Sequence, residues 1–378
     1  MPNPFEFSQP VLGANFADRE EELKTLTTRM LAGQNVIVIS PRRYGKTSLI
    51  LNAAAAARNK GGRTGIANLF WCQTRRDVAQ ELANAVVRGP LGGLRGGIEE
   101  LRRWIGKLPG ATLFLEKDGY RLSLSPTKPQ SDWTTEIRRL MALLQESSSR
   151  RHPVSLVIDE FQKVAEIDPG LPSLFKSLTD QELRGVSLVL SGSRRHVMHE
   201  LTAGQGAPML GIGEILTLQP VSEKDMTNFL QQRTEAAGKK MTDGAARLLY
   251  ARARGVPAYV QRLAFEAYEG AGRVIDEAGV ETAVATVLRR ERQYFEVMYE
   301  DLAPNQRRMM RALAQQPARS ITSRDFLDRA GLRADSSSHR ALSALEVAEK
   351  VELGPDGWQV TDPLFALWLA GGAAAEGE

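Results

Sequence analysis

One stretch near the N-terminus restricts the possible folds more than any other. Residues 35–51 read NVIVISPRRYGKTSLIL, in which a β-branched run is followed by a turn, by Gly-Lys-Thr-Ser and by helix-forming residues that continue to Ala57. The apolar run has the length and composition of a buried parallel strand. A strand, a glycine-containing turn and a helix in this order predict a phosphate-binding loop.

The predicted loop offers groups that suit a nucleotide phosphate. The loop residues predicted to bind the nucleotide are Arg42, Arg43, Tyr44, Gly45, Lys46, Thr47 and Ser48. Their backbone N–H groups would lie at a helix N-terminus, where the helix dipole favours negative charge. Lys46 would reach the β and γ phosphates, and the Thr47 hydroxyl would bind Mg²⁺. Ser40 stands where the pattern G-x-x-x-x-G-K-[ST] has its first glycine, so this turn requires a negative φ at Ser40.

A second motif supplies carboxylates that complement the loop. Residues 154–161 read VSLVIDEF, an apolar strand that ends in Asp159 and Glu160. If this strand lies near the loop strand, Asp159 would hold Mg²⁺ directly or through water, and Glu160 would polarise the attacking water. Adjacent acids also occur at strand ends by chance. Their combination with the loop favours the catalytic interpretation.

Three further buried strands are predicted at residues 64–72, 186–191 and 214–218. Helices alternating with these strands predict an α/β fold, a doubly wound P-loop NTPase three-layer sandwich with a parallel five-stranded sheet. The ligand is expected at the carboxyl edge of that sheet. Ser193 and Arg194 follow the strand 186–191 and are candidates to face the γ phosphate, although an arginine pair there is as often a solvated turn.

Several features surround this core. Asp18 is a plausible cap of the first helix, and Arg19 is either a solvated helix residue or a contact of the nucleotide base or the neighbouring helix. A glycine-rich stretch at 89–97 and a hairpin at 111–125, turning at residues 117–119, suggest an insertion over about 89–132.

At 378 residues the chain is too long for one ordinary domain. An ATPase core is predicted at 1–220, an all-helical lid at 221–295 and a winged helix at 296–378. After the ATPase core, no strand pattern appears before Val351. The winged-helix prediction rests on helices at 303–314, 323–330 and 336–349 and on a hairpin that turns at 354–357. Within the lid, Pro257 is either a helix start or a contact of the nucleotide.

Charge and cysteine content narrow the choice of partners. Residues 301–378 carry nine Lys or Arg and eleven Asp or Glu, although the whole chain has a net charge of +4. Since a DNA-reading domain is normally basic, DNA is not expected mainly through the winged helix, where His339 and Arg340 are the only obvious readers. One cysteine, the lack of an apolar membrane span and the lack of a signal pattern predict a cytoplasmic protein without membrane attachment.

The ordered set NPFEFSQPV, FADREEEL, SPRRYGKTSL, LVIDEF, LSGSRR, GVPAY and TDPLFALWL resembles the prokaryotic and archaeal ATPases grouped with the STAND and AAA+ NTPases. The resemblance implies ATP or ADP and Mg²⁺ as cofactors, Lys46 and Glu160 as catalytic residues, and Thr47 and Asp159 as metal ligands. It also implies base contacts near Arg19 and Pro257.

Two departures separate the chain from ring-forming members. No arginine occurs between Arg195 and Arg233, where those members supply one to a neighbour, and Pro257 replaces the lid arginine of replication initiators. Both favour a slow ATPase that acts as a nucleotide-controlled switch and moves its winged helix toward a protein partner. A DNA-associated AAA+ ATPase and a nucleotide-bound scaffold without significant turnover remain the alternatives, and nucleotide-dependent oligomerisation stays open.

Overall fold

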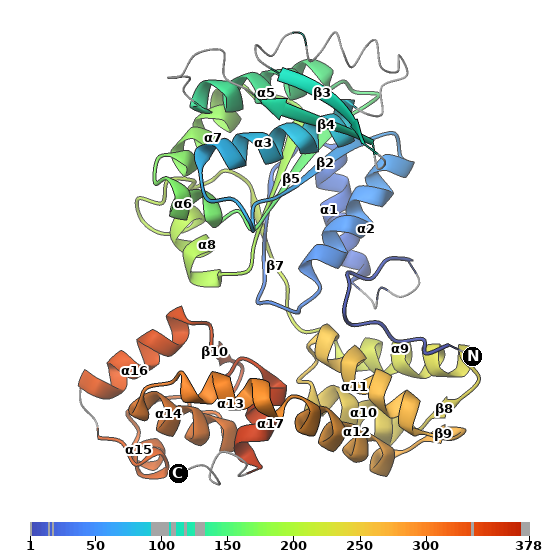
Figure 1. Ribbon diagram of the computed structural model, residues 1–378, viewed down its shortest axis with the longest axis vertical. Helices are drawn as coiled ribbons and strands as arrows, with labels where there is room; N and C mark the ends of the chain where they lie inside the picture. The colour runs from blue at the N-terminus through green and yellow to red at the C-terminus, as the bar shows by residue number, and fades with distance from the viewer. Residues whose placement is uncertain are drawn as a thin grey trace. The chain divides into compact units, whose positions relative to one another are not determined.

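The chain folds into two compact units (Figure 1). A computed structural model describes residues 2–13, 16, 19–91, 106, 111–116, 119–124, 133–333 and 336–371. The first unit consists of Arg19–Gln219, and the second combines Met1–Asp18 with Pro220–Glu378. The sequence assigned residues 1–18 to the ATPase core, whereas the described residues among them belong to the second unit. Asn3 donates from Nδ2 to the Phe265 carbonyl at 3.0 Å, and the Phe7 ring meets the Phe265 ring edge-on at 5.4 Å.

The first unit is built on a parallel sheet with the order β2-β5-β6-β1-β7. Its strands are β1 (Val36–Ile39), β2 (Arg63–Asn68), β5 (Val154–Asp159), β6 (Val186–Gly192) and β7 (Glu214–Thr217). All four neighbouring pairs are parallel, which confirms the predicted five-stranded sheet. The loop strand β1 lies inside the sheet, with β6 between it and β5. The carboxyl ends of β1, β5 and β6 therefore meet at one edge.

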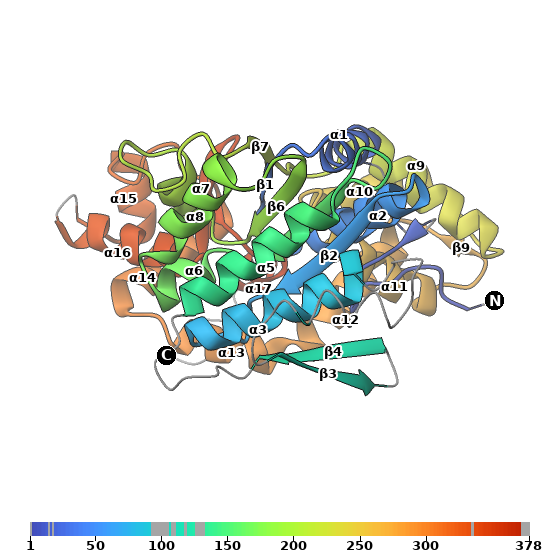
Figure 2. The ribbon, with the colours of Figure 1, turned by 90° about the horizontal axis from the view of Figure 1, so that it is seen from above.

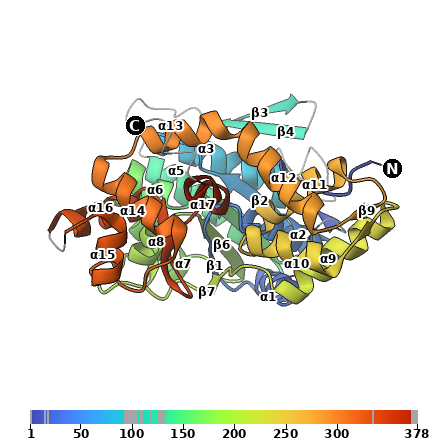
Figure 3. The ribbon, with the colours of Figure 1, turned by 90° about the horizontal axis from the view of Figure 1, so that it is seen from below.

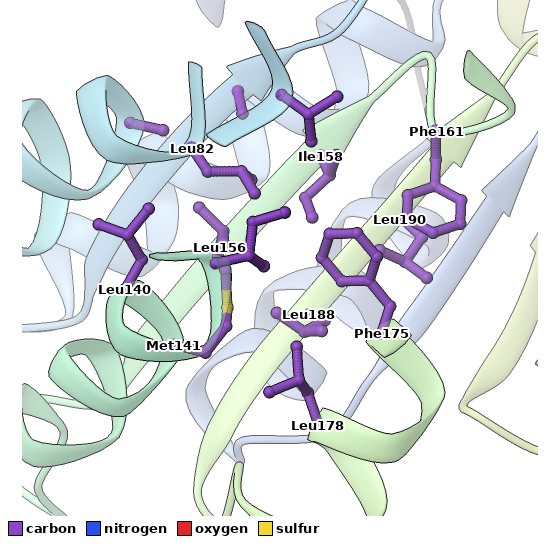
Figure 4. Close-up of a cluster of buried hydrophobic side chains, with 14 of the residues drawn as sticks. Leu82, Leu140, Met141, Leu156, Ile158, Phe161, Phe175, Leu178, Leu188 and Leu190 are labelled. Atoms are coloured by element: carbon purple, nitrogen blue, oxygen red, sulfur yellow. The ribbon is translucent and has the colours of Figure 1, made fainter. Parts of the chain in front are cut away.

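Helices cover both faces of this sheet (Figure 2). One face is packed by α3 (Arg75–Val86), α5 (Trp133–Ser147) and α7 (Leu171–Gln181), whose apolar side chains form a single core with those of the strands. Leu156, Ile158, Phe161 and Phe175 belong to this core (Figure 4). Because strand side chains alternate, Val157 faces the other side, which α1 (Glu20–Leu31) and α2 (Lys46–Asn59) cover.

The predicted insertion is partly described. β3 (Ala111–Glu116) and β4 (Gly119–Leu124) pair antiparallel, which confirms the hairpin. The Leu124 N–H donates to Gln80 Oε1 of α3 at 2.9 Å, so the hairpin is fixed to this helix. A short π-helical turn, η2 (Val87–Leu91), follows α3. The turn residues 117–118, the glycine-rich residues 92–97 and Asp18 lie outside the described residues.

The second unit contains a helical region and a winged helix (Figure 3). The helical region comprises α9 (Glu223–Ala236), α10 (Asp243–Arg252), α11 (Pro257–Gly270) and α12 (Glu277–Arg290). A two-residue parallel pair, β8 (Lys240–Met241) with β9 (Val274–Ile275), corrects the expectation of no strand before Val351. The winged helix comprises α13 (Arg292–Glu300), α14 (Pro304–Gln315), α15 (Arg324–Ala330), α16 (Ser336–Val347), β10 (Val351–Gly354), β11 (Gly357–Val360) and α17 (Pro363–Ala370). Gly354 pairs with Gly357, which confirms the predicted turn.

The helical region and the winged helix pack against each other within this unit. On the winged-helix side, Phe295 of α13 stacks on Phe365 of α17 with ring centroids 5.7 Å apart. Arg254, just after α10, joins the two parts by donating from Nη1 to the Val360 carbonyl of β11 at 2.7 Å. The boundary predicted between residues 295 and 296 falls inside α13. Within the described part of the chain, no helix combines the length and apolar composition needed to cross a membrane.

Candidate nucleotide site

The loop between β1 and α2 leaves open space at the start of the helix. Gly45 caps α2 with a φ of 83°, a left-handed backbone that favours glycine. No heavy atom of the described chain lies within 4 Å of the place that a Cβ at Gly45 would take. Ser40 has no left-handed φ, as its place in the loop requires, and its N–H donates to the Gly192 carbonyl at 3.4 Å. The first backbone N–H groups of α2 have no acceptor within the helix.

Lys46 lies between the two predicted carboxylates. Its Nζ is 3.2 Å from Asp159 Oδ1 and 3.4 Å from Glu160 Oε1, and its side chain is only 7% exposed. The Thr47 hydroxyl donates to Asp159 Oδ2 at 3.5 Å. The fold therefore brings together the four residues predicted to be catalytic or metal-binding, across the end of β6. Their roles in binding and hydrolysis remain predictions.

Asp159 has a further partner that the sequence did not predict. The hydroxyl of Ser191, in β6, donates to Asp159 Oδ1, and the Glu160 N–H donates to the same oxygen at 3.0 Å. Ser191 is fully buried. The only signal in the sequence was a hydroxyl residue near the end of a mainly apolar strand. These donors fix the orientation of the Asp159 carboxylate, which is buried.

Glu160 is held by two side chains from different segments. Ser193, just after β6, donates from Oγ to Glu160 Oε2 at 3.0 Å, and Gln162 donates from Nε2 to the same oxygen. Glu160 also has a φ of 55°, which is uncommon for a residue other than glycine. Residues with such a backbone conformation are found most often at functional sites. Gln162 was missed because its position in sequence resembles an ordinary turn. Oε2 is thus fixed, and Oε1 faces Lys46.

The remaining arginine candidates lie differently. Arg194 forms an ion pair with Glu166 and directly precedes α8 (Arg195–Thr202). Its contact with a γ phosphate stays a prediction. Arg42 and Arg43 are exposed on the loop, and Arg43 has a left-handed φ of 72°.

Arg19 is buried beneath the loop. Its side chain donates from Nη2 to the Tyr44 carbonyl at 2.9 Å and to the Gln219 carbonyl at 2.8 Å, and from Nη1 to Glu22 at 3.0 Å. With 4% of its surface exposed, it is not the solvated helix residue that one interpretation proposed. Arg19 therefore ties the phosphate-binding loop to the end of the segment that follows β7.

Pro257 occupies the first position of α11, which confirms its role as a helix start. The preceding Gly255 has a φ of 68°, and a Cβ there would lie 2.7 Å from Cζ of the Tyr250 ring. Only glycine fits this turn. Pro257 belongs to the second unit, and its contact with a nucleotide remains a prediction.

A parallel five-stranded sheet, a Gly-Lys-Thr loop after β1 and carboxylates after β5 define a Walker-type P-loop fold with a C-terminal winged helix. Residues 293–371 match a family described as a probable winged helix domain. A comparison with curated protein sequences finds no match.

Solved structures share this architecture along the whole chain. The Walker-type ATPase of Pyrococcus abyssi superposes with a TM-score of 0.67 at 16% identity, over 97% of this chain and 99% of that one. The ORC2 protein of Aeropyrum pernix, solved in ADPNP-ADP complexes, gives 0.58 at 14% identity, over 98% and 97%. CDC6P from Pyrobaculum aerophilum gives 0.50 at 17% identity, over 98% and 97%. The chain thus has the fold of Walker-type, AAA+-like ATPases.

The residues at the loop suit ATP and Mg²⁺. A helix N-terminus, the open space at Gly45 and the Lys46 ammonium match a polyphosphate. The Thr47 hydroxyl and the Asp159 carboxylate, whose oxygens lie 3.5 Å apart, are the hard oxygen ligands that Mg²⁺ prefers.

We expect Arg19→Met to destabilise the first unit, because it leaves two carbonyl groups without their charged donor. The expected loss is about 2–4 kcal/mol in the free energy of unfolding, measured by equilibrium urea unfolding. Arg29→Met is the matched control on the same helix: Arg29 pairs with Glu214 with both side chains over 40% exposed, and its loss should cost below about 1 kcal/mol. Equal losses in both variants would contradict the proposed stabilising role of the Arg19 hydrogen bonds.

Proposed function

We propose that the chain binds ATP with Mg²⁺ at the β1–α2 loop and hydrolyses it slowly. One observation carries this proposal: the buried Lys46 ammonium, at the start of α2, lies within 3.4 Å of both Asp159 and Glu160. A buried ammonium between two carboxylates is poised to exchange one partner for a phosphate oxygen of similar charge.

Each residue of the site has a separable role in this proposal. Lys46 and the N-terminal N–H groups of α2 bind the β and γ phosphates. Thr47 and Asp159 hold Mg²⁺, which neutralises charge on the phosphate oxygens when bound. Glu160 accepts the proton of the attacking water at Oε1, while Ser193 and Gln162 orient it through Oε2.

Two features support slow turnover. The sequence has no arginine between Arg195 and Arg233 to stabilise charge on the γ phosphate, and such an arginine is worth about 10³–10⁵ in rate in related chemistry. Lys46 also contacts the oxygen that Glu160 would use as a base.

We also infer that the nucleotide controls the unit that carries the winged helix. The chain crosses between the units at Asp18–Arg19 and at Gln219–Pro220. Arg19 follows the first crossing and donates to the carbonyl just before the second, and it donates as well to the Tyr44 carbonyl of the loop. A shift of the loop on nucleotide binding would therefore reach both crossings. A protein is the partner we propose for the winged helix, and the cytoplasm, where ATP is available and Cys72 stays reduced, is the compartment.

Lys46→Ala should remove measurable ATP binding and leave the fold intact, because it deletes the cation placed at the phosphates. Calorimetric titration with Mg-ATP tests this. Lys60→Ala, at the exposed end of the same helix, is the control and should bind as the wild type does. Unchanged affinity of Lys46→Ala would remove the basis of the proposed site.

Glu160→Gln should bind ATP and hydrolyse it more slowly by a factor of about 100 or more, since the amide cannot accept the proton of water. Phosphate release at saturating ATP measures this rate. The control is Asp180→Asn, at an exposed carboxylate of α7, which should keep the wild-type rate. If Glu160→Gln turns over at the wild-type rate, water activation does not depend on this carboxylate.

A further inference from the structure

The first unit has an open pocket of about 560 Å³ beside the end of β2, separate from the predicted nucleotide-binding residues. It is lined by Asn68, Phe70, Trp71, Cys72, Asp77, Gln80 and Glu81. The sequence predicted a strand as far as Cys72, but β2 ends at Asn68. The chain then turns, with the Cys72 N–H donating to the Leu69 carbonyl at 3.0 Å, before α3 begins. This turn presents two aromatic residues outside the sheet.

These two aromatic side chains are exposed together. Trp71 is 84% exposed, the largest fraction among the large apolar side chains of the described residues, and Phe70 is 45% exposed. Their rings meet edge-on with centroids 4.8 Å apart. Single exposed apolar side chains are ordinary on protein surfaces, but an adjacent pair at the mouth of a pocket is typical of an interaction site.

The pocket is also negatively charged. Among its described lining residues are two carboxylates, Asp77 and Glu81, and no lysine or arginine. Glu81 accepts from the Asn68 N–H at 3.2 Å, which keeps its carboxylate at the pocket. Of the nearby cations, Arg75 and Lys163 form ion pairs with Asp168 and Glu166, and Arg76 lies near Asp77.

Two of the lining residues have shifted pKa values. Burial raises the pKa of Asp77, but hydrogen bonds from Thr74 and from the Gln73 and Thr74 N–H groups, with Arg76 nearby, bring it below its ordinary value. Asp77 is therefore ionised near neutral pH. Burial, and then the charges of Glu81 and Asp77, raise the pKa of the Cys72 thiol to about 11. The ionised Asp77 carboxylate thus adds a negative charge to the pocket, in a chain whose net charge is +4.

We propose that this pocket binds an arginine or lysine side chain carried by a protein partner. The faces of Trp71 and Phe70 attract a cation, and the carboxylates of Asp77 and Glu81 pair with it. A nucleic-acid base would also stack on an exposed tryptophan, but its phosphates would then lie near two carboxylates. The local charge therefore selects a basic protein segment.

The pocket is connected to the nucleotide site through the sheet. Asn68 lies opposite Asp159 in the β2–β5 register, and the Leu69 N–H donates to the Asp159 carbonyl at 3.0 Å. A partner bound at Phe70 and Trp71 would thus contact the segment that directly follows β2, whose last residue, Asn68, pairs with Asp159. Binding of a basic segment does not require hydrolysis, so it is tested separately from the proposed ATPase activity.

The test is a fluorescence anisotropy titration of fluorescein-labelled hexa-arginine with the full-length protein at physiological salt. Trp71→Ala should weaken binding about fivefold, because it removes the exposed ring that faces the cation. Glu81→Gln should weaken it about threefold, since the amide keeps the hydrogen bond from Asn68 and loses only the charge. Tyr294→Ala and Glu235→Gln remove an exposed aromatic ring and an exposed acid elsewhere, and should leave the affinity within about twofold.

The outcomes are distinct. Selective weakening by Trp71→Ala and Glu81→Gln supports the proposal. Saturable binding that is equal in all four variants, or no binding up to about 1 mM protein, overturns it. If Trp71→Ala instead weakens binding of a labelled single-stranded oligonucleotide and leaves hexa-arginine unaffected, the pocket is a base-stacking site and the proposal is wrong.

Discussion

The buried contact of Lys46 with Asp159 and Glu160 is the interaction on which the site depends. Three charges share a setting in which less than a fifth of each side chain is exposed. An unpaired charge there costs free energy, so the opposite charges stabilise one another. Their meeting in turn requires β1 and β5 to flank β6 in one parallel sheet, with their carboxyl ends aligned. The apolar strands therefore form the core and also position the charged residues of the site.

A second group of residues supports this contact. Ser191 donates to Asp159, and Ser193 and Gln162 both donate to Glu160. In Glu160, Oε2 accepts from these neutral donors and Oε1 faces Lys46, whereas in Asp159 the same oxygen, Oδ1, accepts from Ser191 and faces Lys46. Arg19 holds the loop from the opposite side, through the Tyr44 carbonyl. The loop geometry is consequently linked both to the carboxylates and to the segment that leads out of the first unit.

The sequence predicted those parts of the structure that follow from local patterns. The five strands, the Gly-Lys-Thr loop, the carboxylate pair and the hairpin between β10 and β11 each have a continuous signature, and the structure confirms them as elements of the fold. Contacts between distant segments have no such signature. Arg19 meets Gln219 across 200 residues, and Gln162 reaches Glu160 only because of the turn after β5. The strands β8 and β9 have two residues each, too few to show any periodicity.

In the switch that we propose, the nucleotide at the loop repositions the unit that carries the winged helix. Electron-spin distance measurement tests it directly, with labels on cysteines introduced at Lys60 and Arg324, both exposed, in a Cys72→Ser background. The account predicts one distance distribution with ADP and a different one with ATP in the Glu160→Gln form, and no such difference once Lys46 is replaced by alanine. The same distribution in the ATP and ADP states would contradict the switch.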